Sequence, residues 1–399
     1  MEFTNYTPFP ALAFQGIDQN EQEFHVLVLR QTLSFAEGAL VYADEQAPLC
    51  AEDEFFGEAN TSSVRQESDL CHYKPKCDVL VNATAVAGAQ PVPRFAVRLK
   101  VTDPQGQRVL EKTLTVTGAR AWEKKPVGWE LSAPAPLTSL PLRYEYAFGG
   151  QCRVNADDPH GAHVPKAFHL TPEQQAQHPD QANPPLAHTV CETNLLGQGY
   201  SEPWYRDALK LTRIAAPQIE ALNDPVRDLD KPYVAQGLGV LHKGHPARRK
   251  LGGTIDAAFI ESQRWLPDDF DFAVWNAAPR DQQCDFLQGD EVVELINLCS
   301  PNTPLAMRDT AGNTVLRLML PGDLPFVLAH YPNGGMGELS AHLDTLIVDT
   351  EHQTVSCVWR ATVGCEPEIA ALEYRMLPKA TLQALRSKFD ALNQGAAHG

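Results

Sequence analysis

Residues 95–116 read FAVRLKVTDPQGQRVLEKTLTV and have a regular β pattern. Apolar and polar residues alternate on both sides of Asp103-Pro104-Gln105-Gly106. In such a tetrapeptide, proline presets the backbone φ at one turn position and glycine allows a positive φ at another. Alternation across a tight turn predicts an antiparallel hairpin with one solvated face, and its strands are expected over residues 95–101 and 109–116.

Short runs rich in β-branched and aromatic residues occur on both sides of this hairpin, and each is predicted to form a strand. These runs are residues 24–30, 78–86, 142–146, 292–296, 315–320 and 326–328. Residues 343–349 and 355–360 flank a polar turn, so they predict a second hairpin near the C-terminal end of the chain.

The middle of the chain has a different composition, with ten prolines between residues 126 and 185. Each proline removes a backbone donor and restricts the residue before it, so ordered loops and short strands are expected there. Helical spacing of apolar residues is found at 366–375 and again at 379–392, which predicts two C-terminal helices.

Together these patterns predict a mainly β fold, in which two antiparallel, sandwich-like β-sheet regions are joined by a proline-rich, loop-rich centre and followed by C-terminal α-helices. The expected divisions are an N-terminal β domain at residues 1–150, a loop-rich central region at 151–284 and C-terminal hairpins with terminal helices at 285–399. Packing as one continuous unit is compatible with this division.

The charge of the chain restricts its partners. Its 399 residues include 33 lysines and arginines against 50 aspartates and glutamates, for a formal net charge of −17. Nucleic acid and anionic membrane surfaces both require clustered cations, so neither is an expected partner. Such an acidic chain suits a soluble protein that resists self-association or meets basic partners.

The expected compartment is the cytoplasm. The first residues, Met1-Glu2-Phe3-Thr4-Asn5, lack the basic and apolar regions of a secretory signal, and no uncharged apolar run reaches the length of a membrane-spanning helix. The nine cysteines include no Cys-x-x-Cys pair. In this setting we expect reduced, mostly buried thiols.

Motifs that would identify an enzyme are missing from the sequence. It contains no P-loop, no Gly-x-Gly-x-x-Gly after a strand, no Gly-x-Ser-x-Gly and no His-Glu-x-x-His. The best metal pattern is His160 and His163 with Asp157, Asp158 and Cys191, but it lacks the paired ligands of a structural zinc site. No catalytic residue, metal or cofactor is therefore predicted.

Short islands that combine glycine and proline with tyrosine, tryptophan, arginine and aspartate stand out instead. Their side chains either pair internally, to hold loops that lack ladder hydrogen bonds, or form a protein-binding face. The candidates for partner binding or loop organisation are Tyr144, Glu145, Phe148, Gly149, Gly150, Thr254, Asp256, Arg264, Trp265, Asp269, Asp281, Trp359 and Arg360.

In this order, the islands resemble the bacterial DUF2169 family, which is associated with type VI secretion. No single motif is specific, but the ordered series is, and it spans nearly the whole chain. The motifs are Asn5-Tyr6-Thr7-Pro8-Phe9, Lys74-Pro75-x-Cys77-Asp78-Val79-Leu80-Val81, Tyr144-Glu145-x-Ala147-Phe148-Gly149-Gly150, Gly253-Thr254-x-Asp256, Leu266-Pro267-x-Asp269-Phe270, Asn276-Ala277-Ala278-Pro279-x-Asp281-Gln282, Asp344-Thr345-Leu346-x-Val348-Asp349 and Trp359-Arg360.

This resemblance implies an adaptor or chaperone rather than an enzyme. Members of the family are encoded beside VgrG spike proteins, PAAR tip proteins and toxic effectors. The resemblance therefore implies that the protein binds and stabilises an effector or its PAAR-like region in the cytoplasm and helps to load it on the VgrG spike.

A second hypothesis from the residues alone is an enzyme of unknown class with a carboxylate and arginine site in the central loops. Asp256, Arg264, Asp269 and Asp281 are the groups that would form it. This hypothesis requires those side chains to converge in one pocket with a strongly perturbed pKa.

Overall fold

The hairpin predicted over residues 95–116 is present in the computed structural model of the protein. Its strands β9 (Arg94–Thr102) and β10 (Arg108–Thr117) run antiparallel, with Val97 opposite Leu114. Both of these side chains are buried, as the alternating pattern requires of one face of the hairpin. The structure describes residues 1–36, 38–59, 61–88 and 90–396.

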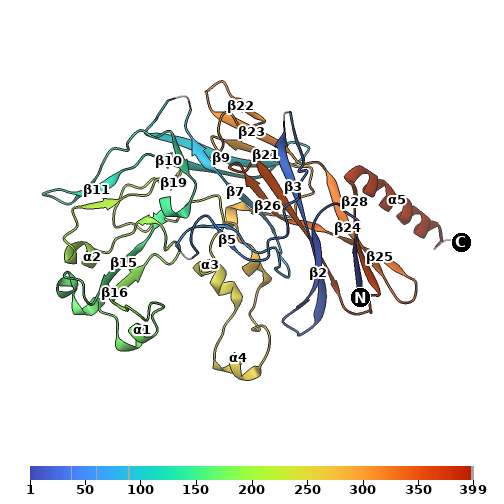
Figure 1. Ribbon diagram of the computed structural model, residues 1–399, viewed down its shortest axis with the longest axis horizontal. Coiled ribbons are helices and arrows are strands. Elements are labelled where there is room, and N and C mark those ends of the chain that lie inside the picture. The colour runs from blue at the N-terminus through green and yellow to red at the C-terminus, as the bar shows by residue number, and fades with distance from the viewer. Residues whose placement is uncertain (37, 60, 89, 397–399) are drawn as a thin grey trace.

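β9 and β10 belong to a six-stranded sheet with the order β19-β10-β9-β21-β23-β22. Its other strands are β19 (Ile219–Ala221), β21 (Val292–Ile296), β22 (Ala306–Arg308) and β23 (Thr314–Met319). β21 pairs directly with β9, so Val293 lies opposite Val101. Strands that are almost 200 residues apart in sequence therefore lie side by side in this sheet (Figure 1).

The second predicted hairpin is also present and lies in a seven-stranded sheet. β26 (His342–Asp349) and β27 (Thr354–Gly364) pair antiparallel, and β7 (Cys77–Asn82) adds to β26 in parallel. The order along the sheet is β2-β3-β27-β26-β7-β20, with β4 paired to β3. The bounds of the remaining strands are β2 (Ala11–Ile17), β3 (Glu23–Ala36), β4 (Ala39–Tyr42) and β20 (Gln283–Cys284).

A four-stranded sheet with the order β1-β28-β24-β25 corrects one helix prediction. Residues 366–375 do not form a helix, because β28 (Ala371–Pro378) lies between β1 (Glu2–Asn5) and β24 (Asp323–His330). Leu372 and Tyr374, two residues apart, are both fully buried, and a spacing of two is the side-chain period of a strand. Neighbouring strands supply the hydrogen bonds that a helix would have made internally. β25 (Met336–Ser340) lies at the edge of this sheet opposite β1.

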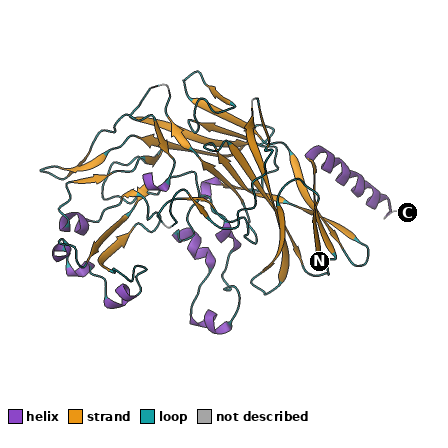
Figure 2. Ribbon diagram, in the orientation of Figure 1, coloured by secondary structure: helices purple, strands orange, loops and turns teal. Residues whose placement is uncertain are grey.

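The second C-terminal helix is confirmed as α5 (Lys379–Ala396). It extends from the end of β28 along one side of the molecule (Figure 1). The main sheets share one hydrophobic cluster, in which Leu27, Val79, Leu99, Leu295 and Leu346 are fully buried. This common core confirms the predicted mainly β, sandwich-like architecture (Figure 2).

The centre of the chain forms loops, short strand pairs and short helices, as the prolines suggested (Figure 2). The remaining short strands of the chain, in the N-terminal part as well as in the centre, are β5 (Glu54–Phe55), β6 (Val64–Gln66), β8 (Thr84–Val86), β11 (Ala121–Lys124), β12 (Trp129–Leu131), β13 (Ser139–Pro141), β14 (Phe148–Gly149), β15 (Gln151–Asn155), β16 (Pro185–Val190), β17 (Gln198–Gly199) and β18 (Arg213–Ala215). The helices are α1 (Pro172–Ala176), α2 (Pro203–Ala208), α3 (Pro246–Arg249) and α4 (Ala257–Ser262). Turns of 3-10 helix lie at Tyr144–Tyr146, Gly161–His163, Lys166–Phe168, Lys250–Gly252, Phe272–Trp275 and Arg280–Gln282.

The strand predicted at 142–146 is wrong, because this segment is one of the 3-10 turns. The backbone N–H of Tyr146 donates to Arg143 O at 3.0 Å, and the N–H of Ala147 donates to Tyr144 O at 3.1 Å. The side chain of Tyr144 is buried, so contacts with distant segments set the local backbone here.

All nine cysteines lie in the described part of the chain as free thiols, and six of them are buried. Among the described residues, no helix combines the length and the apolar character that crossing a membrane would require.

Two leucines of β28 test the corrected assignment. Leu372→Ala should lower the free energy of unfolding by about 2–5 kcal/mol, because it leaves a cavity in the core. Leu377→Ala, five residues along the same strand but only half-buried, should cost clearly less. Urea denaturation followed by circular dichroism measures both, and equal losses would contradict the assigned strand.

Candidate functional site

Several of the sequence islands meet at the buried carboxylate of Asp78, at the start of β7. Lys74 Nζ donates to Asp78 Oδ2 at 2.9 Å, and Asn276 Nδ2 donates to Oδ1 at 3.0 Å. The backbone N–H groups of Ala277 and Ala278 donate to the same carboxylate at 2.9 and 3.2 Å. One side chain therefore joins residues 74–78 to a central segment that lies about 200 residues later.

A second buried carboxylate, that of Asp344 on β26, continues this network. Lys74 Nζ donates to Thr345 Oγ1 at 2.8 Å, and this hydroxyl donates in turn to Asp344 Oδ1 at 2.8 Å. Arg360 Nε on β27 donates to Asp344 Oδ2 at 2.6 Å, and Arg360 Nη1 donates to Cys71 O at 2.7 Å. We call this set, together with Asp78 and Asn276, the buried ion-pair network.

Both cations of this network stay charged although they are buried. Burial alone would lower the pKa of the Lys74 ammonium, but Asp78 and its other neighbours raise the pKa above its ordinary value. Burial opposes the charge of Arg360 in the same way, and Asp344 raises the pKa of the guanidinium. Trp359, beside Arg360, is also buried and donates from Nε1 to Gln31 Oε1 at 2.6 Å. Trp359 and Arg360 therefore lie inside the protein.

The island at 144–150 is held by side chains from two other loops. The Glu145 carboxylate accepts hydrogen bonds from the backbone N–H of Ser63, at 2.8 Å, and from its hydroxyl. Asn194 Nδ2 donates to Tyr144 O at 2.8 Å and to Phe148 O at 3.0 Å. The candidates Tyr144, Glu145 and Phe148 therefore organise a junction of three loops.

Gly149 and Gly150 make the close packing of this junction geometrically feasible. A Cβ atom on Gly149 would overlap the carbonyl oxygen of Asn194. Gly150 has a φ of +118°, and a Cβ on it would come within 2.9 Å of Gly197 O. Only glycine has both this backbone freedom and the missing side chain at these positions.

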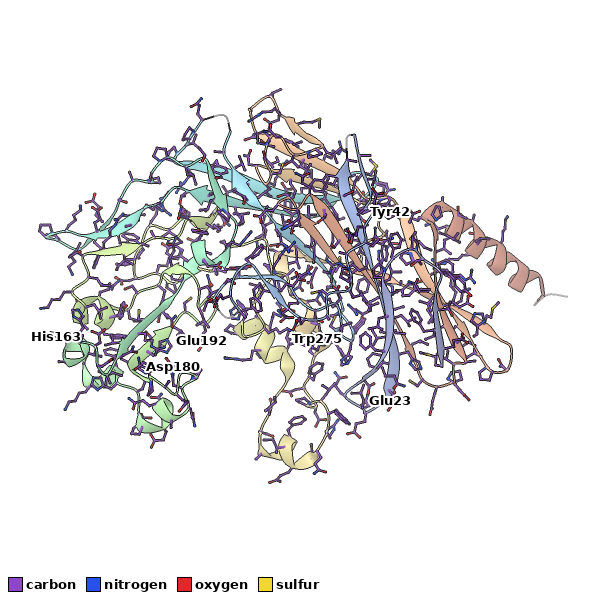
Figure 3. The ribbon with its side chains drawn as sticks, in the orientation of Figure 1. Glu23, Tyr42, His163, Asp180, Glu192 and Trp275 are labelled. Atoms are coloured by element: carbon purple, nitrogen blue, oxygen red, sulfur yellow. The ribbon has the colours of Figure 1, made fainter. Side chains whose placement is uncertain are left out.

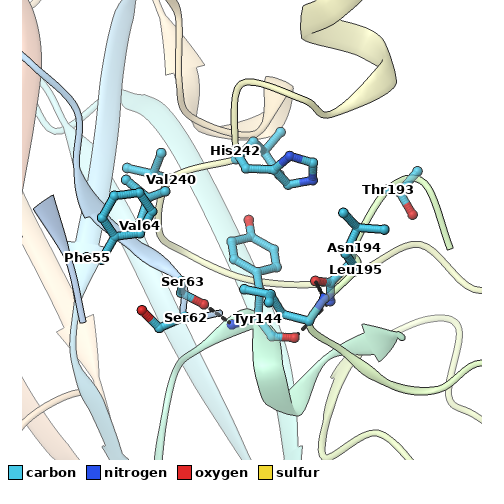
Figure 4. A pocket seen from close by; sticks show the side chains of 12 residues that line it. Phe55, Ser62, Ser63, Val64, Tyr144, Thr193, Asn194, Leu195, Val240 and His242 are labelled. Carbon is cyan, nitrogen blue, oxygen red and sulfur yellow. Dashed lines mark hydrogen bonds between the residues drawn. The ribbon is translucent and has the colours of Figure 1, made fainter. Parts of the chain in front are cut away.

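A small pocket of about 180 Å³ opens at this junction, lined in part by Tyr144 (Figure 4). In this view the Tyr144 hydroxyl points toward the segment that carries Val240 and His242. The walls of the pocket are mostly apolar and include Phe55 and Leu195. None of the lining residues has a permanent charge. Burial raises the pKa of Tyr144 and lowers the pKa of His242, so both are neutral near neutral pH. The pocket has the size and polarity for one apolar side chain.

The islands at 253–256 and 264–270 form one protruding loop, which includes α4. We call residues 253–271 the protrusion (Figure 1). Thr254 closes its base, because its backbone N–H and its hydroxyl donate to the Asp269 carboxylate at 2.8 and 2.7 Å. These two bonds hold the pKa of Asp269 below its ordinary value. Asp256 caps α4 by accepting from the N–H of Phe259 at 2.9 Å.

The protrusion is also attached to the turn between β2 and β3. Arg264 donates to the backbone oxygen of Gln19 in that turn and to the carboxylate of Asp268. Gln19 Nε2 donates back to Phe270 O at 2.7 Å. At the root of the protrusion, Trp275 lies next to the sheet region (Figure 3). Hydrogen bonds on both sides therefore fix the base of this loop.

Three large apolar side chains of the protrusion face solvent. Ile255, Ile260 and Trp265 are 71%, 68% and 74% exposed. Apolar side chains this exposed are costly to leave in water, and grouped ones mark interaction sites. Trp265 is the sequence candidate that is best placed to contact a partner.

The four residues of the enzyme hypothesis occupy two places. Asp256, Arg264 and Asp269 lie on the protrusion, where each bonds to nearby groups. Asp281 instead lies in the 3-10 turn Arg280–Gln282 and accepts from Lys112 Nζ of β10 at 2.9 Å. Asp281 is thus held against the six-stranded sheet rather than on the protrusion.

Among the residues that the structure describes, no three His, Cys, Asp or Glu side chains are grouped to hold a metal ion. His160 and His163 belong to the lobe that carries β15, β16 and α1, with His163 at its outer side (Figure 3). Asp158 accepts from the N–H of His160 at 2.8 Å.

Sequence reasoning omitted several structural residues from its candidates, above all Asp78, Asp344 and Asn194. A signal for two of them was present, because Asp78 and Asp344 interrupt otherwise apolar strands. A charge at a buried strand position requires a paired cation, which could have led to Lys74 and Arg360. For Asn194 the signal was the composition of the island that it begins, Asn194-Leu195-Leu196-Gly197-Gln198-Gly199-Tyr200, since the loop has no periodicity.

Residues 20–360 match the model of a family described as "Uncharacterized protein conserved in bacteria (DUF2169)". No curated protein and no solved structure matches the chain significantly.

Removing one partner of the buried ion-pair network should be strongly destabilising. Asp78→Ala leaves the Lys74 ammonium without its nearest carboxylate and should cost about 3–5 kcal/mol of unfolding free energy. Urea denaturation measures this loss. Glu123→Ala, which breaks the exposed pair with Lys125, is the control and should leave the transition near that of the wild type. A small effect of Asp78→Ala would show that the network is not essential.

The hydrogen bonds from Thr254 to the Asp269 carboxylate predict that closure of the protrusion depends on pH. Thr254→Val removes the hydroxyl bond but keeps the amide bond, so it should raise the pKa of Asp269 part of the way to its ordinary value. NMR titration of the carboxyl group measures this shift. Because the folded pKa is depressed, the closure stabilises the loop above the ordinary Asp range and is lost as pH falls through the folded pKa. The control is Ser262→Ala, which removes a hydroxyl that donates to Phe259 O and should leave the pKa of Asp269 unchanged.

Proposed function

The chain belongs to the bacterial DUF2169 family, and we propose from this membership that it is a cytoplasmic type VI secretion adaptor or chaperone. In this role it binds an effector, or the PAAR-like region of one, and stabilises it before firing. It then helps to load this client on the VgrG spike. Binding of this kind uses no cofactor and no catalytic group of the adaptor.

The observation that best supports a binding role is the exposed apolar surface of the protrusion. Trp265 is the type of residue that dominates binding energy at protein interfaces, and Ile255 and Ile260 add exposed apolar area on the same loop. An exposed tryptophan gains the most when a partner covers it and removes it from water.

The attachment of the protrusion supports the same role. Thr254 and Asp269 close its base, while Arg264 and Gln19 join it to the β2–β3 turn. A loop that is already ordered loses less conformational entropy when it binds. The protrusion therefore offers its apolar side chains on a preorganised support.

Pairwise reconstitution with the neighbouring gene products tests this function. The purified protein should form a stable complex with an effector or PAAR protein encoded near it, and with VgrG in the presence of that client. Trp265→Ala should weaken client binding at least about tenfold, as expected for a central aromatic anchor. Isothermal titration calorimetry measures each affinity.

Val127→Ser is the matched control, because Val127 is 93% exposed and lies between β11 and β12, on a different part of the molecule from α4 (Figure 1). This variant should bind the client as the wild type does. If the protein bound none of the nearby spike, tip and effector proteins, the adaptor function would be wrong.

A further inference from the structure

We propose that the protrusion docks a cationic amphipathic segment of the client protein. The apolar side chains of that segment would cover Trp265, Ile260 and Ile255, and its lysines or arginines would face the carboxylates around them. This inference rests on the proposed adaptor function and adds the chemistry of the partner, which that function leaves open.

The charge of the protrusion is the first argument. Residues 253–271 contain five acidic side chains and only one basic side chain, Arg264, so their formal charge is −4. The five acidic residues are Asp256, Glu261, Asp268, Asp269 and Asp271. All five are exposed on the loop that carries the apolar side chains. Complementary charge in a partner would raise the rate of encounter and select against acidic proteins.

Most of these carboxylates bond to backbone groups rather than to cations. Asp256, Asp269 and Asp271 accept hydrogen bonds from backbone N–H groups, which do not neutralise them. Arg264 is the one cation on the protrusion, and it pairs with Asp268. The remaining excess of negative charge faces solvent and is available to a partner.

The basic segment at 242–250 does not cancel this charge, although it lies near the base of the protrusion. Lys243 pairs with Asp53, Arg248 with Glu67 and Arg249 with Glu192. These carboxylates all lie outside the protrusion. Three of the four lysines and arginines of this segment are therefore engaged in ion pairs elsewhere, and the fourth, Lys250, leaves the protrusion with an excess of negative charge.

Two other occupants fit the surface less well. A second copy of the chain would bring its own charge of −17 toward an already negative surface. An anionic membrane would meet the same repulsion. A positively charged segment with apolar side chains is the partner that both the charge and the exposed area favour.

Two synthetic peptides test this chemistry on the full-length protein. Both are fluorescein-labelled 18-residue amphipathic helices with the same leucine positions, and the polar positions are all lysine in one and all glutamate in the other. Fluorescence anisotropy should show binding of the lysine peptide, with affinity that falls as salt is added. The glutamate peptide should bind at least tenfold more weakly. Equal binding of the two peptides would overturn the proposal.

Variants then locate the binding site. Trp265→Ala combined with Ile260→Ala should reduce affinity for the lysine peptide at least tenfold, and Glu261→Lys should reduce both the affinity and its salt dependence. The matched controls are Glu130→Lys, which reverses the charge of an exposed residue on β12, and Val127→Ser. Apart from a general effect of net charge, they should change neither the affinity for the lysine peptide nor its salt dependence. All the altered side chains are exposed, so circular dichroism should show intact folding. Loss of binding in the controls to the same extent would overturn the proposal.

Competition with the authentic client separates this inference from the adaptor function. If the client binds but the lysine peptide does not displace it, and Trp265→Ala leaves its affinity unchanged, docking at the protrusion is wrong and the adaptor function stands. If the lysine peptide binds at the protrusion but no spike, tip or effector protein does, the adaptor function is wrong and the chemistry of the surface stands.

Discussion

The buried carboxylate of Asp78 is the constraint on which the rest of the structure depends. It is fully inaccessible to solvent, so its charge has to be satisfied by the protein itself. Lys74 supplies a cation, and Asn276 and the following backbone supply hydrogen bonds. The central segment near residue 276 therefore folds against β7, and without it the Asp78 carboxylate would lose three of its four hydrogen-bond donors.

This constraint also explains why a loop-rich centre is ordered. The chain that leads to Asn276 passes through Phe270 and Phe272, whose rings lie 5.2 Å apart. Phe272 also packs against Phe24 and Tyr73 of the sheet region, at 6.4 and 6.0 Å. Charge pairing and aromatic packing thus act together where the chain returns from the protrusion to the core.

The two candidate binding features of the molecule lie on its loops rather than on its central sheets. The Tyr144 pocket is concave and has room for one apolar side chain, whereas the protrusion offers convex apolar area with acidic neighbours. Neither feature uses the residues of the buried ion-pair network. The side chains of the buried ion-pair network are therefore separate from those of the two candidate binding features.

The sequence by itself determined the two hairpins, the C-terminal helix at 379 onward and the mainly β class, because alternation across a turn and helical spacing are local properties of the chain. The tertiary structure alone decided that 371–378 is a strand, since the ladder partners in β1 and β24 are distant in sequence. It also decided the turn at 144–146, through Ser63 and Asn194. The order of the motifs marked the islands, but pairing across about 200 residues determined which of them are buried and which face solvent, and no local pattern encodes such contacts.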